Sequence, residues 1–142
     1  ELIMYRPALS GSIIAKIKSL TKPSMATVRT TQNSSDIVVA AGYGVKDSIE
    51  VVAAFAKSIN ADLAASRKAV DHNLLSYSMQ VGLTGKTVSP PVYIAIGISG
   101  AVHHIAGMQR AGTVIAINPD PNAPIFQYAD YGILEEFSSL KY

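Results

Sequence analysis

The stretch that decides the fold runs from Tyr93 to Ala101 and reads Tyr93-Ile94-Ala95-Ile96-Gly97-Ile98-Ser99-Gly100-Ala101. Its first four residues form an unbroken apolar run, which is typical of a strand buried on both faces. Glycines follow at positions 97 and 100, and residues 101–108 have the pattern of a short helix. A second buried strand is expected over 113–117. Strand, turn, helix and strand in this order predict a β-α-β unit with parallel strands.

The same alternation extends on both sides of this unit. Upstream, we expect an alternating strand over 24–29, a buried strand over 37–41, a helix over 46–58 and a short strand over 61–65. Asp47 and Ser48 are candidate N-caps of that helix, and a last strand is expected over 131–134. Residues 30–36 are polar and predict a loop or a join across missing residues. The whole pattern predicts an α/β fold with an open, mostly parallel sheet and helices on both faces.

The composition narrows the class of protein. The 142 residues suit a single domain over 1–142, in which residues 1–30 form a strand-forming lead-in. The net charge is +2 with no dense Lys/Arg run, so neither a nucleic-acid stripe nor a polybasic membrane patch is expected. The sequence has no Cys, which excludes thiolate chemistry and fits an intracellular protein. No apolar run approaches the ~20 residues of a membrane span.

Two glycine-containing loops are candidate ligand sites. The turn over 97–101 lets backbone approach a ligand closely, and phosphate suits such a turn with Ser99 adding a hydroxyl. A tight turn whose glycines only satisfy steric needs explains the pattern equally well. The loop over 82–87 resembles part of a P-loop, but Gln80 occupies the position of its first glycine and Ser89-Pro90-Pro91 prevents a long helix. NTP hydrolysis is therefore not expected, and the loop is either a surface loop or faces a ligand.

Polar residues near expected strand ends are the remaining candidates. Arg67 and Asn118 each follow a strand, and ligands of open parallel sheets bind at that edge; a solvated side chain is the simpler explanation of Arg67 alone. His103 and His104 point about 100° apart on a helix, so they are not a zinc pair. His104 lies one turn from Gly100 and can lean toward a ligand. No carboxylate pair predicts hydrolysis, and no metal site is expected.

Four segments share the motifs of one known family in the family's own order. They are 65–71, similar to A-S-R-x-A-V-D; 80–90, similar to V-G-Q-T-G-K-x-V-x-P; 93–108, similar to Y-I-A-x-G-I-S-G-A-x-x-H-x-A-G-M; and 116–126 with 129–132, similar to A-I-N-x-D-x-x-A-P-I-F…A-D-Y-G. Arg6-Pro7 and residues 25–29 match weaker upstream patterns. Over nearly its whole length, the chain resembles the C-terminal FAD-binding domain of the electron transfer flavoprotein α subunit.

The resemblance implies a Rossmann-like domain of the deoxyhypusine synthase-like NAD/FAD-binding type, with FAD in an extended pose. It implies an electron carrier rather than an enzyme, which accepts electrons from dehydrogenases and passes them on. The implied partners are a β-type subunit or a dehydrogenase, and a homodimer is a further alternative. The implied location is the cytoplasm of a prokaryote or the mitochondrial matrix of a eukaryote.

The resemblance also implies roles by position. Thr84 would hydrogen-bond flavin N5, Arg67 would lie over the isoalloxazine, and His104 would donate to the flavin C2 carbonyl. Residues 99–102 would hold the diphosphate, while Asn118 and Glu136 would serve the adenosine end. The full implied cofactor-binding set is Gly42, Tyr43, Ser66, Arg67, Val81, Gly82, Leu83, Thr84, Ser99, Gly100, Ala101, Val102, His103, His104, Asn118 and Glu136.

Elementary electrostatics supports the roles that the resemblance implies for Arg67, Thr84 and His104 beside the flavin. Reduction places negative charge near N1 and the C2 oxygen, so a donor aimed there stabilises the reduced form more than the oxidised one. A charge-assisted hydrogen bond contributes ~1.5–3 kcal/mol, equivalent to roughly 65–130 mV for one electron. Arg67 keeps its charge at any ordinary pH, whereas the share of His104 is expected to vary with pH.

Several departures from the family pattern keep alternatives open. Tyr43 stands where the family has Arg in G-G-R-G, so one phosphate-facing charge is expected to be missing. Leu83 replaces a Gln, Glu136 replaces an Asp, the segment between Arg29 and Asp36 is shorter, and the family's separate N-terminal domain is expected to be absent. The alternatives are a degenerate or non-redox nucleotide-binding relative and an NAD-dependent enzyme on the same fold.

Overall fold

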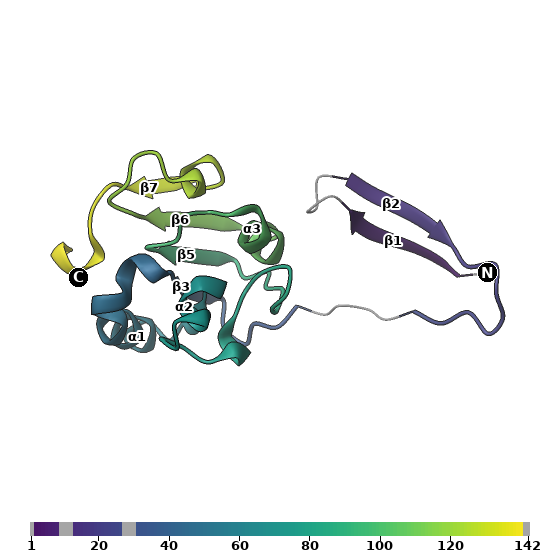
Figure 1. Cartoon of the computed structure of the whole chain (residues 1–142), viewed down its shortest axis with the longest axis horizontal. Helices are drawn as coiled ribbons and strands as arrows, with labels where there is room; N and C mark the ends of the chain where they lie inside the picture. Colours follow the sequence, from purple (N-terminus) through teal and green to yellow (C-terminus); the bar gives the residue numbers. More distant parts are fainter. Residues whose placement is uncertain (1, 9–12, 27–30, 141–142) are drawn as a thin grey trace. The chain divides into compact units, whose positions relative to one another are not determined.

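A computed structural model describes residues 2–8, 13–26 and 31–140 and divides the chain into two compact units, 1–30 and 31–142. The first unit contains an antiparallel hairpin of β1 (Ile3–Ala8) and β2 (Ile13–Lys18), in which Ile3 faces Lys18 (Figure 1). The strand expected over 24–29 is not seen in Ser24–Ala26. Its remaining residues lie outside the described ranges.

The second unit is built on a five-stranded sheet in the order β4-β3-β5-β6-β7, with every neighbouring pair parallel. Its strands are β3 (Ile37–Ala41), β4 (Asp62–Ala65), β5 (Val92–Ile96), β6 (Thr113–Ile117) and β7 (Tyr131–Ile133). The four buried or short strands expected over 37–41, 61–65, 93–96 and 113–117 are confirmed, and the last strand is confirmed one residue shorter. Apolar, β-branched side chains suit strands that are covered on both faces.

Helices follow the strands with one shift from expectation. The helix expected over 46–58 begins later, as α1 (Ile49–Ser58), and the residues before it form the 3₁₀ segment η2 (Tyr43–Ser48). Ser48 does precede α1, but its side chain makes no capping hydrogen bond. The other helices are α2 (Arg67–Asp71) and α3 (Val102–Met108), and short 3₁₀ turns are η3 (Tyr77–Met79), η4 (Pro124–Gln127) and η5 (Phe137–Ser139).

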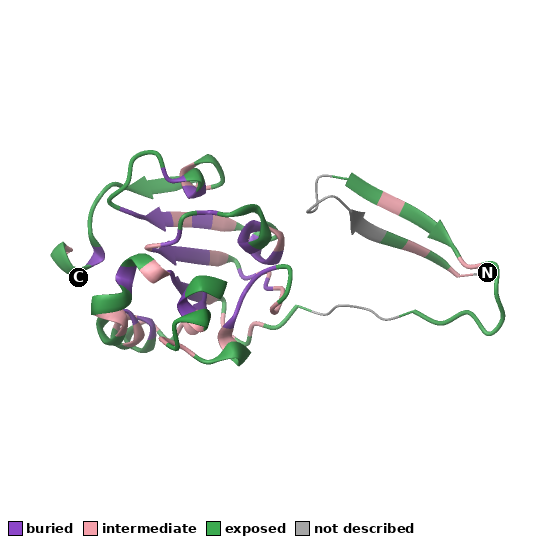
Figure 2. Cartoon of the chain, in the orientation of Figure 1, coloured by how far each residue is buried: buried purple, intermediate pink, exposed green. Residues whose placement is uncertain are grey.

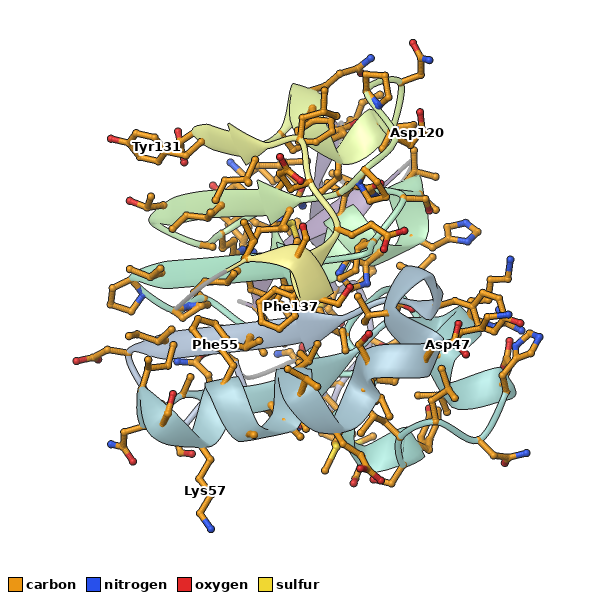
Figure 3. All side chains as sticks on the ribbon, turned by 90° about the vertical axis from the view of Figure 1, so that its left-hand side faces the viewer. Asp47, Phe55, Lys57, Asp120, Tyr131 and Phe137 are labelled. Atoms are coloured by element: carbon orange, nitrogen blue, oxygen red, sulfur yellow. The ribbon has the colours of Figure 1, made fainter. Side chains whose placement is uncertain are left out.

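Two apolar layers sandwich the sheet because alternate strand residues point to opposite faces. Val39 and Ile96 belong to the layer beneath α1, where the rings of Phe55 and Phe137 meet edge to face at 5.4 Å (Figure 3). On the other face, side chains of β3, β5 and β6 pack with α3, through residues that include Tyr93, Ile105 and Met108. The buried residues concentrate in these layers (Figure 2). Helices on both faces of a parallel sheet confirm the predicted fold class.

The polar segment before β3 is anchored to the sheet. Ser34 donates from its hydroxyl to the Asp62 carboxylate at 2.8 Å, and the Ser35 backbone N–H donates to the same side chain at 3.0 Å. Thr31 forms an isolated bridge with Thr87. The described part of 30–36 is therefore a loop fixed by long-range hydrogen bonds.

The strand order creates a topological switch. The connection from β3 leads to β4 on one side, and β5 then pairs with β3 on the other side. At such a switch the loops leaving the strands diverge and open a crevice at the carboxyl edge of the sheet. The loops after β3 and β5 come so close at their base that a Cβ placed on Gly42 would lie 2.0 Å from the Gly97 carbonyl oxygen. Only glycine fits at position 42.

No helix within the described ranges is long and apolar enough to cross a membrane. The same ranges contain no group of three or more His, Cys, Asp or Glu residues suited to holding a metal ion.

Candidate functional site

A pocket of about 560 Å³ opens at the carboxyl edge of the sheet, within the size range of cofactor sites. It is built from segments that follow four neighbouring strands, and from the loop before β5. Its lining residues are Tyr43, Gly44, Ser66, Arg67, Lys68, Asp71, Gln80, Val81, Gly82, Leu83, Thr84, Gly97, Ile98, Ser99, Ala101, His103, His104, Asn118, Asp120, Ala123 and Pro124. Asp47 and Asp120 mark this edge in Figure 3, away from Tyr131 at the start of β7.

Most residues proposed from sequence meet in this pocket. Those that line it are Tyr43, Ser66, Arg67, Val81, Gly82, Leu83, Thr84, Ser99, Ala101, His103, His104 and Asn118. Four others do not line it within the described chain: Gly42 and Gly100 are buried in backbone contacts, Val102 is 54% exposed on α3, and Glu136 is exposed just before η5. The two glycines shape the site from behind, and Val102 lies between the lining residues Ala101 and His103. The roles of Val102 and Glu136 stay predictions.

The loop over 82–87 is held firmly against α3. The Leu83 N–H donates to the His103 carbonyl at 2.7 Å, and the Val88 N–H donates to the Gly107 carbonyl at 2.8 Å. A Cβ on Gly107 would lie 2.4 Å from the Gly82 nitrogen, so small residues are required where loop and helix meet. The loop lines the pocket through Gly82, Leu83 and Thr84, and the interpretation that it faces a ligand stays a prediction.

Gln80 is a site residue that sequence reasoning treated only as a break in a P-loop pattern. It is buried, and its side-chain amide donates to the Thr84 hydroxyl oxygen at 2.9 Å. Tyr77 adds a second restraint, since its hydroxyl donates to the Thr84 carbonyl at 2.7 Å. Together these contacts fix the orientation of Thr84 at the pocket. No pattern in the sequence signals them.

His104 is the most constrained polar side chain of the site. It is 6% exposed, and its Nε2 lies 2.9 Å from the Tyr93 hydroxyl, while Nδ1 makes no hydrogen bond within the described residues. Burial lowers the pKa of His104 to about 4; the nearby Val81 backbone, which makes no hydrogen bond of good geometry with the ring, opposes this in part. The ring is therefore neutral near pH 7, which places the pH dependence expected of its effect in the acidic range. His103, its neighbour on α3, is exposed.

Arg67 lies at the rim of the pocket. Its Nε is 3.5 Å from an Asp71 carboxylate oxygen one turn along α2, and both side chains are more than half exposed. Such an exposed pair is weak, so the guanidinium can turn toward a bound ligand at small cost. Ser66 caps α2, accepting a hydrogen bond from the Ala69 N–H at 3.3 Å.

Positive charge lies close to Tyr43 at the rim of the pocket. The Lys68 ammonium lies 4.6 Å from the centroid of the Tyr43 ring and the Lys46 ammonium 5.6 Å, both within cation–π range. The His72 ring packs at 4.4 Å from the Tyr43 ring. Two lysines thus lie close to the position where a charge was expected to be missing, and Lys68 also lines the pocket.

Asn118 is already engaged by the protein. Its side-chain nitrogen donates to the Ile98 carbonyl at 2.9 Å, and its side-chain oxygen accepts from the Asp120 N–H at 2.9 Å. The first bond ties the loop after β6 to the loop after β5, and the second is local to the loop after β6. Asn118 thereby shapes the adjoining part of the pocket, and a ligand contact would be an additional role.

The side chains that line the pocket suit a large anionic cofactor with an aromatic ring. The pocket combines cationic groups at its rim, hydroxyls from Ser99 and Thr84, and apolar wall from Val81 and Ile98. The unpartnered Nδ1 of His104 is a buried polar atom that a ligand would satisfy, and leaving such an atom unpaired costs about 1–3 kcal/mol. FAD has the matching groups: a diphosphate, hydroxyls, and a ring with carbonyl acceptors.

Similar proteins carry a consistent name. The chain is 54% identical over 100 residues to an electron transfer flavoprotein subunit alpha of Mycobacterium tuberculosis, covering 69% of the chain and 31% of the relative. It is 44% identical over 126 residues to a protein of the same name from Thermoanaerobacterium thermosaccharolyticum, covering 87% and 38%. A Caenorhabditis elegans protein, named probable electron transfer flavoprotein subunit alpha, mitochondrial, is 42% identical over 127 residues, covering 88% and 36%.

The chain thus spans about a third of the length of these curated relatives. Residues 32–109 match the family model described as the electron transfer flavoprotein FAD-binding domain. That segment includes β3, β4, β5 and α3. It also contains nearly all of the pocket segments, which agrees with the motifs noted in the sequence. This chain therefore belongs to the family of electron transfer flavoprotein FAD-binding domains, whose cofactor is FAD.

Proposed function

We propose that this chain holds FAD in the pocket at the carboxyl edge of the sheet and serves as an electron carrier, without a substrate reaction of its own. One observation carries the proposal: Arg67, Thr84 and His104, from three separate segments, line one pocket together with the glycine turn after β5. Bound FAD supplies one-electron redox chemistry, and the protein supplies binding and electrostatic tuning.

The chain's own residues divide this work. Arg67, Thr84 and His104 would face the flavin ring, with His104 as a neutral donor. Residues 99–101 and Lys68 would face the diphosphate, and Asn118 would orient the loop near the adenosine end. Glu136 stays a prediction for that end, although it lies away from the pocket lining. The apolar walls and the buried base of the pocket would exclude water from the ring.

A titration with three ligands tests the proposal. FAD-free protein is titrated with FAD, NAD and AMP while visible absorbance and flavin fluorescence are followed. We expect saturable FAD binding with a shifted flavin spectrum, followed by full one- or two-electron reduction by dithionite. Protein that takes up no FAD would contradict the proposal. Preferential binding of NAD with turnover would favour an enzyme, and binding of AMP alone a non-redox relative.

The partners and setting follow from the same proposal. We infer that residues 31–142 form the FAD-binding domain with 1–30 as a lead-in. We also infer that the chain pairs with a β-type subunit, accepts electrons from a dehydrogenase and passes them to an acceptor. The setting would be the cytoplasm in a bacterium or the matrix in a mitochondrion. Sedimentation of the FAD-loaded chain alone and with a β-type subunit separates a heterodimer from a homodimer.

A further inference from the structure

A buried tyrosine contacts the histidine of the pocket from beneath. Tyr93, in β5, is fully buried, and its hydroxyl lies 2.9 Å from His104 Nε2. The two rings are 6.2 Å apart between centroids. This contact joins the strand to α3, and His104 is also one of the residues that line the pocket.

The direction of this hydrogen bond follows from proton counting. A neutral imidazole has one N–H and one acceptor nitrogen. The His104 ring is the hydrogen-bond partner that the described residues offer to the Tyr93 hydroxyl, so donation from the hydroxyl to Nε2 is the arrangement that satisfies the buried O–H. The imidazole proton then lies on Nδ1. The opposite arrangement would leave the tyrosine hydrogen without an acceptor among the described residues.

We propose that Tyr93 is a positioning residue that fixes His104 in the tautomer with its proton on Nδ1, so that the imidazole presents a neutral N–H donor to an acceptor group bound in the pocket. The identity of that acceptor, a flavin carbonyl, rests on the proposed function. The tautomer itself does not, because it is a property of the protein without ligand. Tyr93 acts through His104 and need not touch the cofactor.

Burial keeps both partners in the forms that this arrangement needs. It lowers the pKa of His104 to about 4, so the ring is neutral at pH 7. It raises the pKa of the Tyr93 hydroxyl, so that group remains protonated. With neither charge changing near neutral pH, the site of the imidazole proton is the property left to control.

Nitrogen NMR on histidine-labelled, FAD-free protein tests the tautomer directly. The chain has three His residues, and a His104→Gln variant assigns the His104 signals by their loss. We expect the wild-type ring at pH 7 to carry its proton on Nδ1. Tyr93→Phe, which keeps the ring but removes the hydroxyl, should lose this single tautomer. Tyr131→Phe, at an exposed residue of β7, should retain it.

The flavin potential gives a second readout that a purely structural role would not move. In Tyr93→Phe we expect the reduced form of FAD to lose up to about tenfold in binding relative to the oxidised form, a potential about 59 mV lower. A wild-type ring protonated on Nε2 would overturn the proposal even if Tyr93→Phe failed to fold. So would an unchanged tautomer and potential in that variant. A fixed Nδ1 tautomer in protein that binds no FAD would support this inference while contradicting the proposed function.

Discussion

Arg67 is the residue whose proposed effect on the flavin potential is easiest to test. It is exposed and paired only weakly with Asp71, so its replacement should not disturb the core. We expect Arg67→Ala to retain FAD but to lower the flavin potential by roughly 65–130 mV, because a permanent positive charge near the reduced ring is lost. Spectroelectrochemical titration measures the shift. Asp71→Asn, which frees the guanidinium, should leave the potential equal or raise it; an unchanged potential in Arg67→Ala with intact binding would refute this role.

Lys68 should compensate for the charge that Tyr43 lacks. It lies over the Tyr43 ring and lines the pocket, so its ammonium is placed to attract the diphosphate. We expect Lys68→Ala to weaken FAD binding about two- to fivefold, the range for an exposed charge pair, and more strongly at low ionic strength. Fluorescence quenching of FAD at two salt concentrations measures this.

The matched control for that measurement is Lys57→Ala. Lys57 lies in the last turn of α1 and projects outward from the helix (Figure 3), outside the residues that line the pocket. Its replacement should leave both the affinity and its salt dependence unchanged. Equal effects of the two substitutions would mean that only the net charge of the protein matters.

His104 should give the protein a pH-dependent stability of definite sign. The folded pKa is lowered to about 4, while the unfolded value is about 6.5. Folding therefore favours the neutral ring, and this contribution is complete above pH 6.5 and lost as the pH falls toward 4. The loss amounts to about 3 kcal/mol. Urea unfolding of FAD-free protein between pH 4 and 7 measures it, and His104→Gln should show a flatter profile in that window.

At the scale of elements, the connection from β5 to α3 depends on Gly100. Its φ is +91°, and a Cβ there would lie 2.3 Å from the backbone nitrogen of Ile125 at η4. We expect Gly100→Ala to destabilise the protein by at least about 2 kcal/mol, through left-handed strain and overlap with backbone that cannot move aside. Denaturant unfolding checks this. Val102→Ala, at an exposed neighbour, should cost no more than about 0.5 kcal/mol.

Elements whose signal is local could be predicted from sequence, and those set by distant contacts could not. The runs 37–41 and 113–117 are apolar enough to identify strands without any context. The helix expected from residue 46 begins only at Ile49. The Gly44 N–H donates to the Gly97 carbonyl at 3.1 Å, which holds η2 against the turn after β5, and the sequence gives no sign of this contact. The family motifs predicted that Arg67, Thr84 and His104 share one site, and all three line the pocket. Gln80, Lys68 and Tyr93 were missed because their roles arise from packing against residues of other segments.

At the scale of the whole molecule, both apolar layers and the pocket lie within one unit. Every buried residue of the two layers and every residue lining the pocket has a number above 31. The described strands of the first unit form one two-stranded hairpin, and a two-stranded hairpin alone is marginally stable at best. The cooperative core of the described chain is therefore that of the second unit.

A chain that begins at Thr31 should accordingly fold and bind FAD without the hairpin. We expect its midpoint of urea unfolding and its FAD affinity to match those of the full chain within about twofold in equilibrium constant, since no described residue of the two apolar layers or of the pocket lining is removed. Circular dichroism during unfolding and FAD fluorescence quenching measure the two quantities. The matched control is a chain that ends at Ile117, which removes β7 and the core residues Ile125 and Phe137 and should not fold. Loss of FAD binding in the chain that begins at Thr31, with its fold intact, would show that residues 1–30 contribute to the site and would extend the functional domain over the whole sequence.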